Sequence, residues 1–131
     1  MDGLSRKIMQ SFVDEYLEDR ELLILDLGSL DVTGNYNKCF NNPKWKIIGA
    51  DIVEGKNVDI VLKKPYEWEE FKDNSFDVVI SGQTFEHIEY PWLTIKEIYR
   101  VLKPGGVGCL VAPSAGYEHG YPTDCWRILP D

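Results

Sequence analysis

Five short apolar runs, each ending in polar or glycine residues, limit the fold of this 131-residue sequence more than any other feature. They cover residues 22–25, 45–50, 58–62, 76–80 and 107–112. Continuous apolar runs of this length are typical of strands buried on both faces of a parallel sheet. Because parallel strands need crossover connections, the pattern predicts an α/β fold, with a mostly parallel sheet of about five strands flanked by helices.

Two segments have the periodicity of amphipathic helices. Residues 4–17 repeat apolar side chains every four positions and carry charges on the other face. Residues 91–102 form the second segment, with Pro91 in its first turn. Residues 103–106, Lys-Pro-Gly-Gly, are expected to end this helix and turn the chain into the last strand.

Length and composition limit the class of protein. One domain over residues 1–131 is expected, because no repeat or linker is visible. No apolar run approaches the roughly 20 residues of a membrane-spanning helix, and the first ten residues lack the apolar stretch of a secretory signal. These observations predict a cytoplasmic protein with no membrane partner. A formal net charge of −8 and the lack of a basic stripe disfavour nucleic acid and favour a small molecule or a protein as partner.

The cysteines predict reduced thiols. Cys39, Cys109 and Cys125 are odd in number and form neither a CxxC pair nor a Cys/His cluster. Structural thiols fit this pattern better than a disulfide framework or a zinc site.

Ligands in open α/β sheets bind outside the carboxyl ends of the strands. Gly28, after the first run, permits a tight bend and a close approach to the backbone. Asp26 is placed to accept a hydrogen bond from an ammonium group or to fix the loop through backbone amides. Asp51, after the second run, is placed to accept two hydrogen bonds from ribose hydroxyls. A glycine loop followed by an acid also fits an ordinary capped turn, so both interpretations stay open.

The glycine spacing bears on the kind of nucleotide. A dinucleotide fingerprint needs G-x-G-x-x-G against a pyrophosphate, whereas here Gly28 and Gly34 are separated by five residues. A ligand with one nucleoside and no phosphate is better matched. An NAD-dependent oxidoreductase is therefore the disfavoured alternative.

Four segments, in order, resemble the motifs of the class I S-adenosylmethionine-dependent methyltransferases, which have a Rossmann-like fold. They are LLILDLGSLDVTG, IIGADI, FDVVISGQTFEHI and RVLKPGGVGCLVAPS. The first departs from the common D-x-G-x-G-x-G form and is closer to a subgroup with a longer G-S-x-D-V-x-G loop. The resemblance implies a methyltransferase whose cofactor is S-adenosylmethionine, with S-adenosylhomocysteine as product.

The resemblance also implies which residues contact the cofactor. Those expected around its methionine part are Asp26, Gly28, Ser29, Asp31, Gly34 and Asn35. Asp51 would bind the ribose and Ile52 would pack on the adenine. Ser81 and Gln83 would approach the sulfonium. Many relatives bind the adenine amino group through an acid after the third strand, but Lys63 and Lys64 stand near that place here.

His87 follows the fourth run. Many relatives carry a histidine there, so capping or packing is favoured over catalysis. The spacing Gln83-x-x-Glu86-His87 is similar to the E-x-x-E-H metal site of some methyltransferases. Glutamine in place of the first acid removes a ligand charge, so no metal is expected.

The segment after the fifth run is the candidate acceptor site. Methyl transfer from a sulfonium mainly requires alignment, with a base only where the acceptor must lose a proton. His119 is the candidate catalytic base. The candidates for binding the acceptor are Tyr117, Tyr121, Asp124, Trp126 and Arg127. Such side chains suit a saccharide or a hydroxylated metabolite, and residues 117–127 are expected to close over the acceptor side; an ordinary packing loop is the equal alternative.

The family's sheet has seven strands, and this sequence ends shortly after the fifth run. We therefore expect a sheet without the final two strands, in a shortened or naturally minimal core. A non-catalytic cofactor-binding or structural domain is the second functional alternative. Residues 107–112 would form a sheet edge without charge or proline, which predicts a homodimer through that edge or a covered edge.

Overall fold

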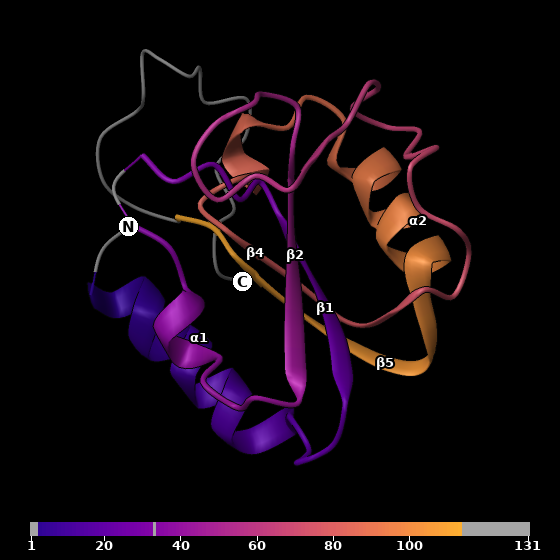
Figure 1. Ribbon diagram of the computed structural model, residues 1–131. Helices are drawn as coiled ribbons and strands as arrows, with labels where there is room; N and C mark the ends of the chain where they lie inside the picture. Colours follow the sequence, from indigo (N-terminus) through magenta and orange to yellow (C-terminus); the bar gives the residue numbers. More distant parts are fainter. Residues whose placement is uncertain (1–2, 33, 114–131) are drawn as a thin grey trace.

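The computed structural model describes residues 3–32 and 34–113 of the chain (Figure 1). The helices and strands, in chain order, are α1 (Gly3–Tyr16), β1 (Leu22–Leu27), β2 (Trp45–Asp51), β3 (Ile60–Val61), β4 (Phe76–Gly82), α2 (Pro91–Val101) and β5 (Leu102–Val111). Two short 3-10 helices, η1 (Asn37–Cys39) and η2 (Phe85–His87), complete the described elements. Pro91 opens α2, as the sequence predicts.

The strands form one parallel sheet in the order β3-β2-β1-β4-β5. The prediction of a Rossmann-like α/β fold is confirmed. Strand order reverses between β1 and β4, because β2 and β3 lie on one side of β1 and β4 and β5 on the other. This reversal makes the carboxyl ends of β1 and β4 the expected place for a ligand.

Apolar side chains pack on both faces of the sheet. On one face, Ile24 and Ile80 join Met9 and neighbouring side chains of α1 in one buried cluster. On the other face, Leu25 joins Ile98 of α2 in a second cluster. Successive strand residues point to opposite faces, which explains why the run at 22–25 is apolar at every position. Figure 1 shows α1 and α2 on opposite sides of the sheet.

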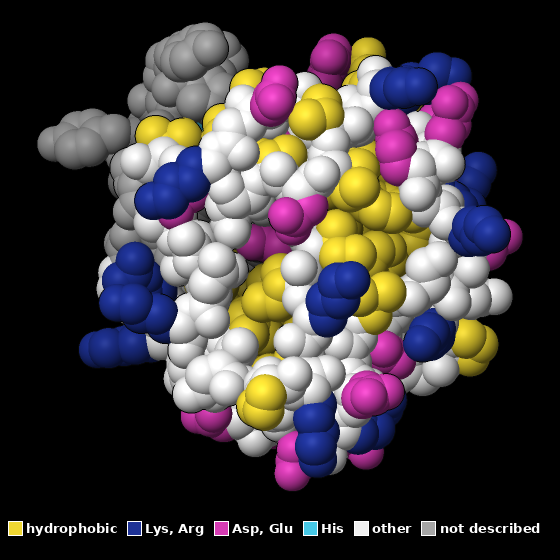
Figure 2. All heavy atoms as spheres, viewed as in Figure 1, with side chains coloured by type: hydrophobic (Ala, Val, Ile, Leu, Met, Phe, Trp, Pro, Cys, Tyr) yellow, Lys and Arg dark blue, Asp and Glu magenta, His cyan; other side chains and the backbone are white. Residues whose placement is uncertain are grey.

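The β2 side of the sheet is less completely covered. Within the described residues, the connections from β1 to β2 and from β3 to β4 contain no α-helix. Ile47 and Ile48 are half-buried as a result, and Val61 is 42% exposed. Figure 2, seen from this edge of the sheet, shows apolar side chains gathered at the surface around β2.

The third and fifth strands differ most from the sequence-based expectation. The third strand was expected at 58–62 but only Ile60–Val61 pairs, with Ala50 and Asp51 of β2. Residues 103–106 were expected as a turn before the last strand, yet β5 already begins at Leu102. They form an irregular stretch within β5, because the pairing with β4 shifts register between Phe76 and Val78.

No helix in the described part of the chain has both the length and the apolar character needed to cross a membrane.

Among the described residues, β5 pairs with β4 alone, so it lies at an edge of the sheet. The homodimer through this edge stays a prediction. Sedimentation at micromolar concentration should show a dimer, and Leu110→Lys, which places a charge on β5, should shift it to monomer. Leu4→Lys, at an exposed apolar position of α1, is the control and should leave the dimer intact. A wild-type monomer would contradict the prediction.

Candidate functional site

A cavity of about 730 Å³ opens where β1, β2 and β4 end. Its volume lies in the range of small-molecule sites. The described residues that line it include Asp26, Leu27, Gly28, Ser29, Gly34, Asn35, Asp51, Ile52, Leu62, Pro65, Tyr66, Trp68, Gln83, Thr84 and His87. Eight of the ten predicted cofactor contacts are therefore brought together here; Asp31 and Ser81 are not among the lining residues.

The loop that begins at Gly28, called the glycine loop below, turns sharply at the end of β1. Gly28 has a φ of +74°, which disfavours other residues, and a Cβ there would collide with the side chain of Thr84. The backbone N–H groups of Gly28 and Ser29 both donate to the carbonyl of Ala50, at 2.8 and 3.2 Å. These bonds hold the loop against the end of β2.

Asp31 organises the same loop from within. Its Oδ1 accepts from the Gly34 N–H at 2.8 Å, and its Oδ2 accepts from Asn35 Nδ2 at 2.7 Å. The hydrogen bond from Asn35 is the main cause that lowers the pKa of Asp31 below its ordinary value. Both oxygens are thus engaged inside the loop, which is why this predicted contact does not line the cavity.

Asp51 lies at the end of β2 and joins the two loops beside the cavity. Its Oδ2 accepts from the Leu30 N–H at 3.1 Å, and its Oδ1 accepts from the Val53 N–H at 3.2 Å. A carboxylate offers about four acceptor positions, so both oxygens keep capacity for further donors from the cavity.

Asp26 is only 4% exposed, and its side chain forms no hydrogen bond or ion pair with the described residues. Burial, followed by repulsion from Asp51, raises the pKa of Asp26 to about 7. The expected alternative, that Asp26 fixes the loop through backbone amides, is wrong, because Asp31 and Asp51 accept those bonds. A cationic ligand group would find an acceptor here without a competing donor from the described part of the chain.

The two residues predicted near the sulfonium have different surroundings. Ser81 is fully buried, and its hydroxyl donates to the Leu27 carbonyl at 2.9 Å. Gln83 lies at the cavity with a left-handed φ of +57°, held by a bond from its N–H to the Val111 carbonyl at 2.7 Å. Left-handed backbone is uncommon for glutamine and recurs at functional sites.

One wall of the cavity is apolar and aromatic. Ile52 lies at the rim of the cavity and is 59% exposed. The rest of this wall is formed by Leu62, Tyr66 and Trp68. Sequence reasoning missed Tyr66 and Trp68; the available signal was the pair of aromatic residues shortly after the third apolar run. Lys64 instead pairs with Glu67 and Glu69.

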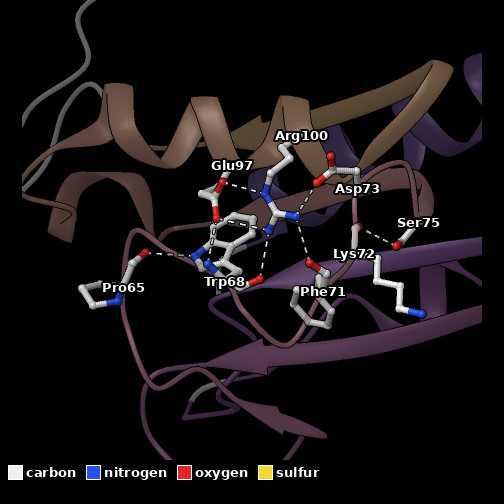
Figure 3. A network of polar contacts seen from close by, with 8 residues as sticks. All are labelled: Pro65, Trp68, Phe71, Lys72, Asp73, Ser75, Glu97 and Arg100. Atoms are coloured by element: carbon white, nitrogen blue, oxygen red, sulfur yellow. Dashed lines mark hydrogen bonds and ion pairs between the residues drawn. The ribbon is translucent and has the colours of Figure 1, made fainter.

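Arg100 and Glu97 of α2 hold this wall in place (Figure 3). The Arg100 guanidinium donates to the carbonyls of Trp68 and Phe71, both at 2.9 Å, and to Asp73 at 2.8 Å. Glu97 accepts from Arg100 Nε at 2.9 Å and from the Trp68 N–H at 2.7 Å. The irregular connection between β3 and β4 is therefore tied to α2 by side chains.

His87 lines the cavity, with its Nε2 3.4 Å from Glu86 Oε1. The proposed base and acceptor-binding side chains lie outside the described residues: His119, Tyr117, Tyr121, Asp124, Trp126 and Arg127.

A family model described as "Methyltransferase domain" matches residues 25–110. The chain is 33% identical over 89 residues to 2-methyl-6-phytyl-1,4-hydroquinone methyltransferase 1 of Oryza sativa subsp. japonica, covering 66% of this chain and 24% of that protein. It thus spans about a quarter of the length of this relative.

Two solved structures share the fold. A SAM-dependent methyltransferase from Aquifex aeolicus aligns with a TM-score of 0.65 and 21% identity, over 91% of this chain and 72% of that one. The cyclase SpnF aligns with a TM-score of 0.63 and 23% identity, over 79% of this chain and 43% of that one.

Asp26→Asn should remove a pH dependence of stability. Because folding raises the pKa of Asp26 from 3.8 to about 7, protonation stabilises the folded chain. This stabilisation is complete below about pH 4 and is lost as pH rises through about 7. Between about pH 4 and 8, the free energy of unfolding should fall by ~4 kcal/mol more in the wild type than in the variant. Parallel urea-denaturation profiles over this pH range would contradict the prediction.

Arg100→Met should destabilise the fold by about 2–4 kcal/mol, because Glu97 and two backbone carbonyls lose their donor. Arg100→Lys should recover only part of this loss, since one ammonium cannot reach all the acceptors. Lys96→Met, at an exposed position of the same helix, is the control. Equal urea midpoints for Arg100→Met and the wild type would show that the network contributes nothing.

Proposed function

The chain belongs to the methyltransferase domain family, and from this premise we propose that it binds S-adenosylmethionine in the cavity and transfers its methyl group to a small hydroxylated molecule. Membership confirms the resemblance of the four motifs, and S-adenosylmethionine is the cofactor. The roles of individual residues and the acceptor are our proposals.

The observation that carries the residue assignment is the arrangement of two carboxylates beside an apolar wall. Asp26 and Asp51 both line the cavity, and Asp26 has no donor among the described residues. A cofactor with an ammonium group, a ribose and an adenine matches these three kinds of surface. We assign Asp26 to the ammonium, Asp51 to the ribose hydroxyls, and Ile52 to the adenine.

Bound S-adenosylmethionine supplies the reactive methyl group and its leaving group. The residues of the chain orient the cofactor and exclude water. Trp68 is 1% exposed and backs the apolar wall, while the glycine loop lets the cofactor approach the backbone. An ammonium group beside Asp26 favours its ionised form, so binding near pH 7 should release a proton.

An aromatic cluster beside the cavity supports a ring-containing acceptor. Tyr66 lines the cavity, its ring centroid lies 5.6 Å from that of Tyr90, and Tyr90 lies 5.7 Å from Trp92. Tyr90 and Trp92 are 41% and 58% exposed. Aromatic faces suit both a saccharide and a hydroxylated aromatic ring, and the rice relative is named for a hydroquinone. Transfer of radiolabelled methyl to a saccharide or a hydroquinone panel distinguishes these acceptors.

A cofactor-binding domain without catalysis is the alternative. The occurrence of this fold in a protein named as a cyclase supports considering it, because the fold alone does not determine methyl transfer. Cofactor binding without methyl transfer to either panel would favour this alternative.

Asp51→Ala should weaken S-adenosylhomocysteine binding about tenfold or more, because charge-assisted bonds to the ribose are worth roughly 1.5–3 kcal/mol. Since Asp51 also accepts from Leu30 and Val53, Asp51→Asn is included; it keeps one acceptor for the loops and should bind with intermediate affinity. Glu15→Ala, on the exposed face of α1, is the control. Unchanged calorimetric affinity in Asp51→Ala would remove this assignment.

A further inference from the structure

Asn57 lies in the loop between β2 and β3 and forms hydrogen bonds with Ser29 and Asn37, which both follow β1. Its Nδ2 donates to the Ser29 carbonyl at 3.0 Å, and its backbone carbonyl accepts from Ser29 Oγ at 2.7 Å. Its Oδ1 accepts from Asn37 Nδ2 at 3.1 Å. Because the Ser29 carbonyl can only accept, the amide orientation is determined by the contacts. Both polar atoms of the Asn57 side chain are therefore committed to the loop that follows β1.

The backbone around Asn57 is shaped for this contact. Asn57 has a φ of +70°, a conformation that asparagine tolerates better than most residues. Gly49 of β2 lies against it, and a Cβ at position 49 would collide with the Asn57 carbonyl and approach Ser29 Oγ to 2.6 Å. The close packing of these three residues makes the position of Ser29 depend on Asn57.

The bonds of Asn57 join the two loops that the proposed cofactor must contact together. Ser29 belongs to the loop assigned to the methionine part, and the loop of Asn57 begins at the ribose acid, Asp51. Further bonds, from the Asp31 N–H to the Lys56 carbonyl at 3.0 Å and from the Leu30 N–H to Asp51, join the same loops. Of the side chains in the Asn57 loop, Asn57 alone bonds to Ser29 within the described residues.

We propose that Asn57 is a positioning residue that sets the separation between the methionine-binding and ribose-binding loops. The inference rests on the proposed function. A ligand that contacts both loops depends on this separation, whereas a ligand that contacts only the ribose side does not. Asn57 should therefore affect the affinity for the whole cofactor and leave the affinity for its nucleoside part unchanged.

Asn57→Gly separates these effects, because glycine accepts the positive φ and keeps the backbone carbonyl that bonds Ser29 Oγ. It removes only the two side-chain bonds. By calorimetry on the full chain, the Kd for S-adenosylhomocysteine should rise about tenfold, and the Kd for adenosine should change less than about twofold. Asn57→Asp keeps an acceptor for Asn37 but loses the donor to Ser29, so it should show the same selective loss.

Asn74→Gly is the matched control, because Asn74 also has a positive φ, of +54°, but precedes β4 at the opposite end of the sheet. It should bind both ligands as the wild type does. Wild-type affinity for S-adenosylhomocysteine in Asn57→Gly, or an equal loss for both ligands, would overturn the role of Asn57 alone. A wild-type chain that binds neither ligand would overturn the proposed function and this inference with it.

Discussion

Parallel pairing of β1 with both β2 and β4 is the constraint on which the rest of the structure depends. Asp26 lies opposite Gly49 of β2 and Ile80 of β4, so the carboxyl ends of these three strands lie side by side. This alignment places the glycine loop beside Asp51 and sets a buried carboxylate near a second one. The raised pKa of Asp26 follows from this placement, because the carboxyl group is buried at the strand end and lies near the carboxylate of Asp51.

Side-chain hydrogen bonds to the backbone hold in place the connections of this sheet that contain no α-helix within the described residues. Asp31 and Asp51 hold the loop after β1, and Arg100 holds the irregular connection after β3. Each of these bonds satisfies a backbone group of an irregular segment. The loops at the cavity are thereby shaped by a few polar side chains, and substitutions there alter stability and ligand affinity together.

The sheet and the position of the cavity were predictable because apolar runs and the polar residues after them are local features. Gly28 follows β1 directly and Asp51 is the last residue of β2, so their places at the cavity could be inferred. Ser81 could not be placed, because its hydroxyl satisfies the Leu27 carbonyl of the neighbouring strand. The contacts of Arg100 span about 30 residues of sequence, and no local pattern indicates such partners.

Calorimetric titration of the wild-type chain with S-adenosylhomocysteine and with NAD, near pH 7 in two buffers of different ionisation enthalpy, tests the central claim most directly. We predict that S-adenosylhomocysteine binds and that NAD does not. The apparent binding enthalpy should differ between the buffers, because the ligand's ammonium group displaces a proton from Asp26. Binding of NAD without S-adenosylhomocysteine would contradict the assignment of the cavity.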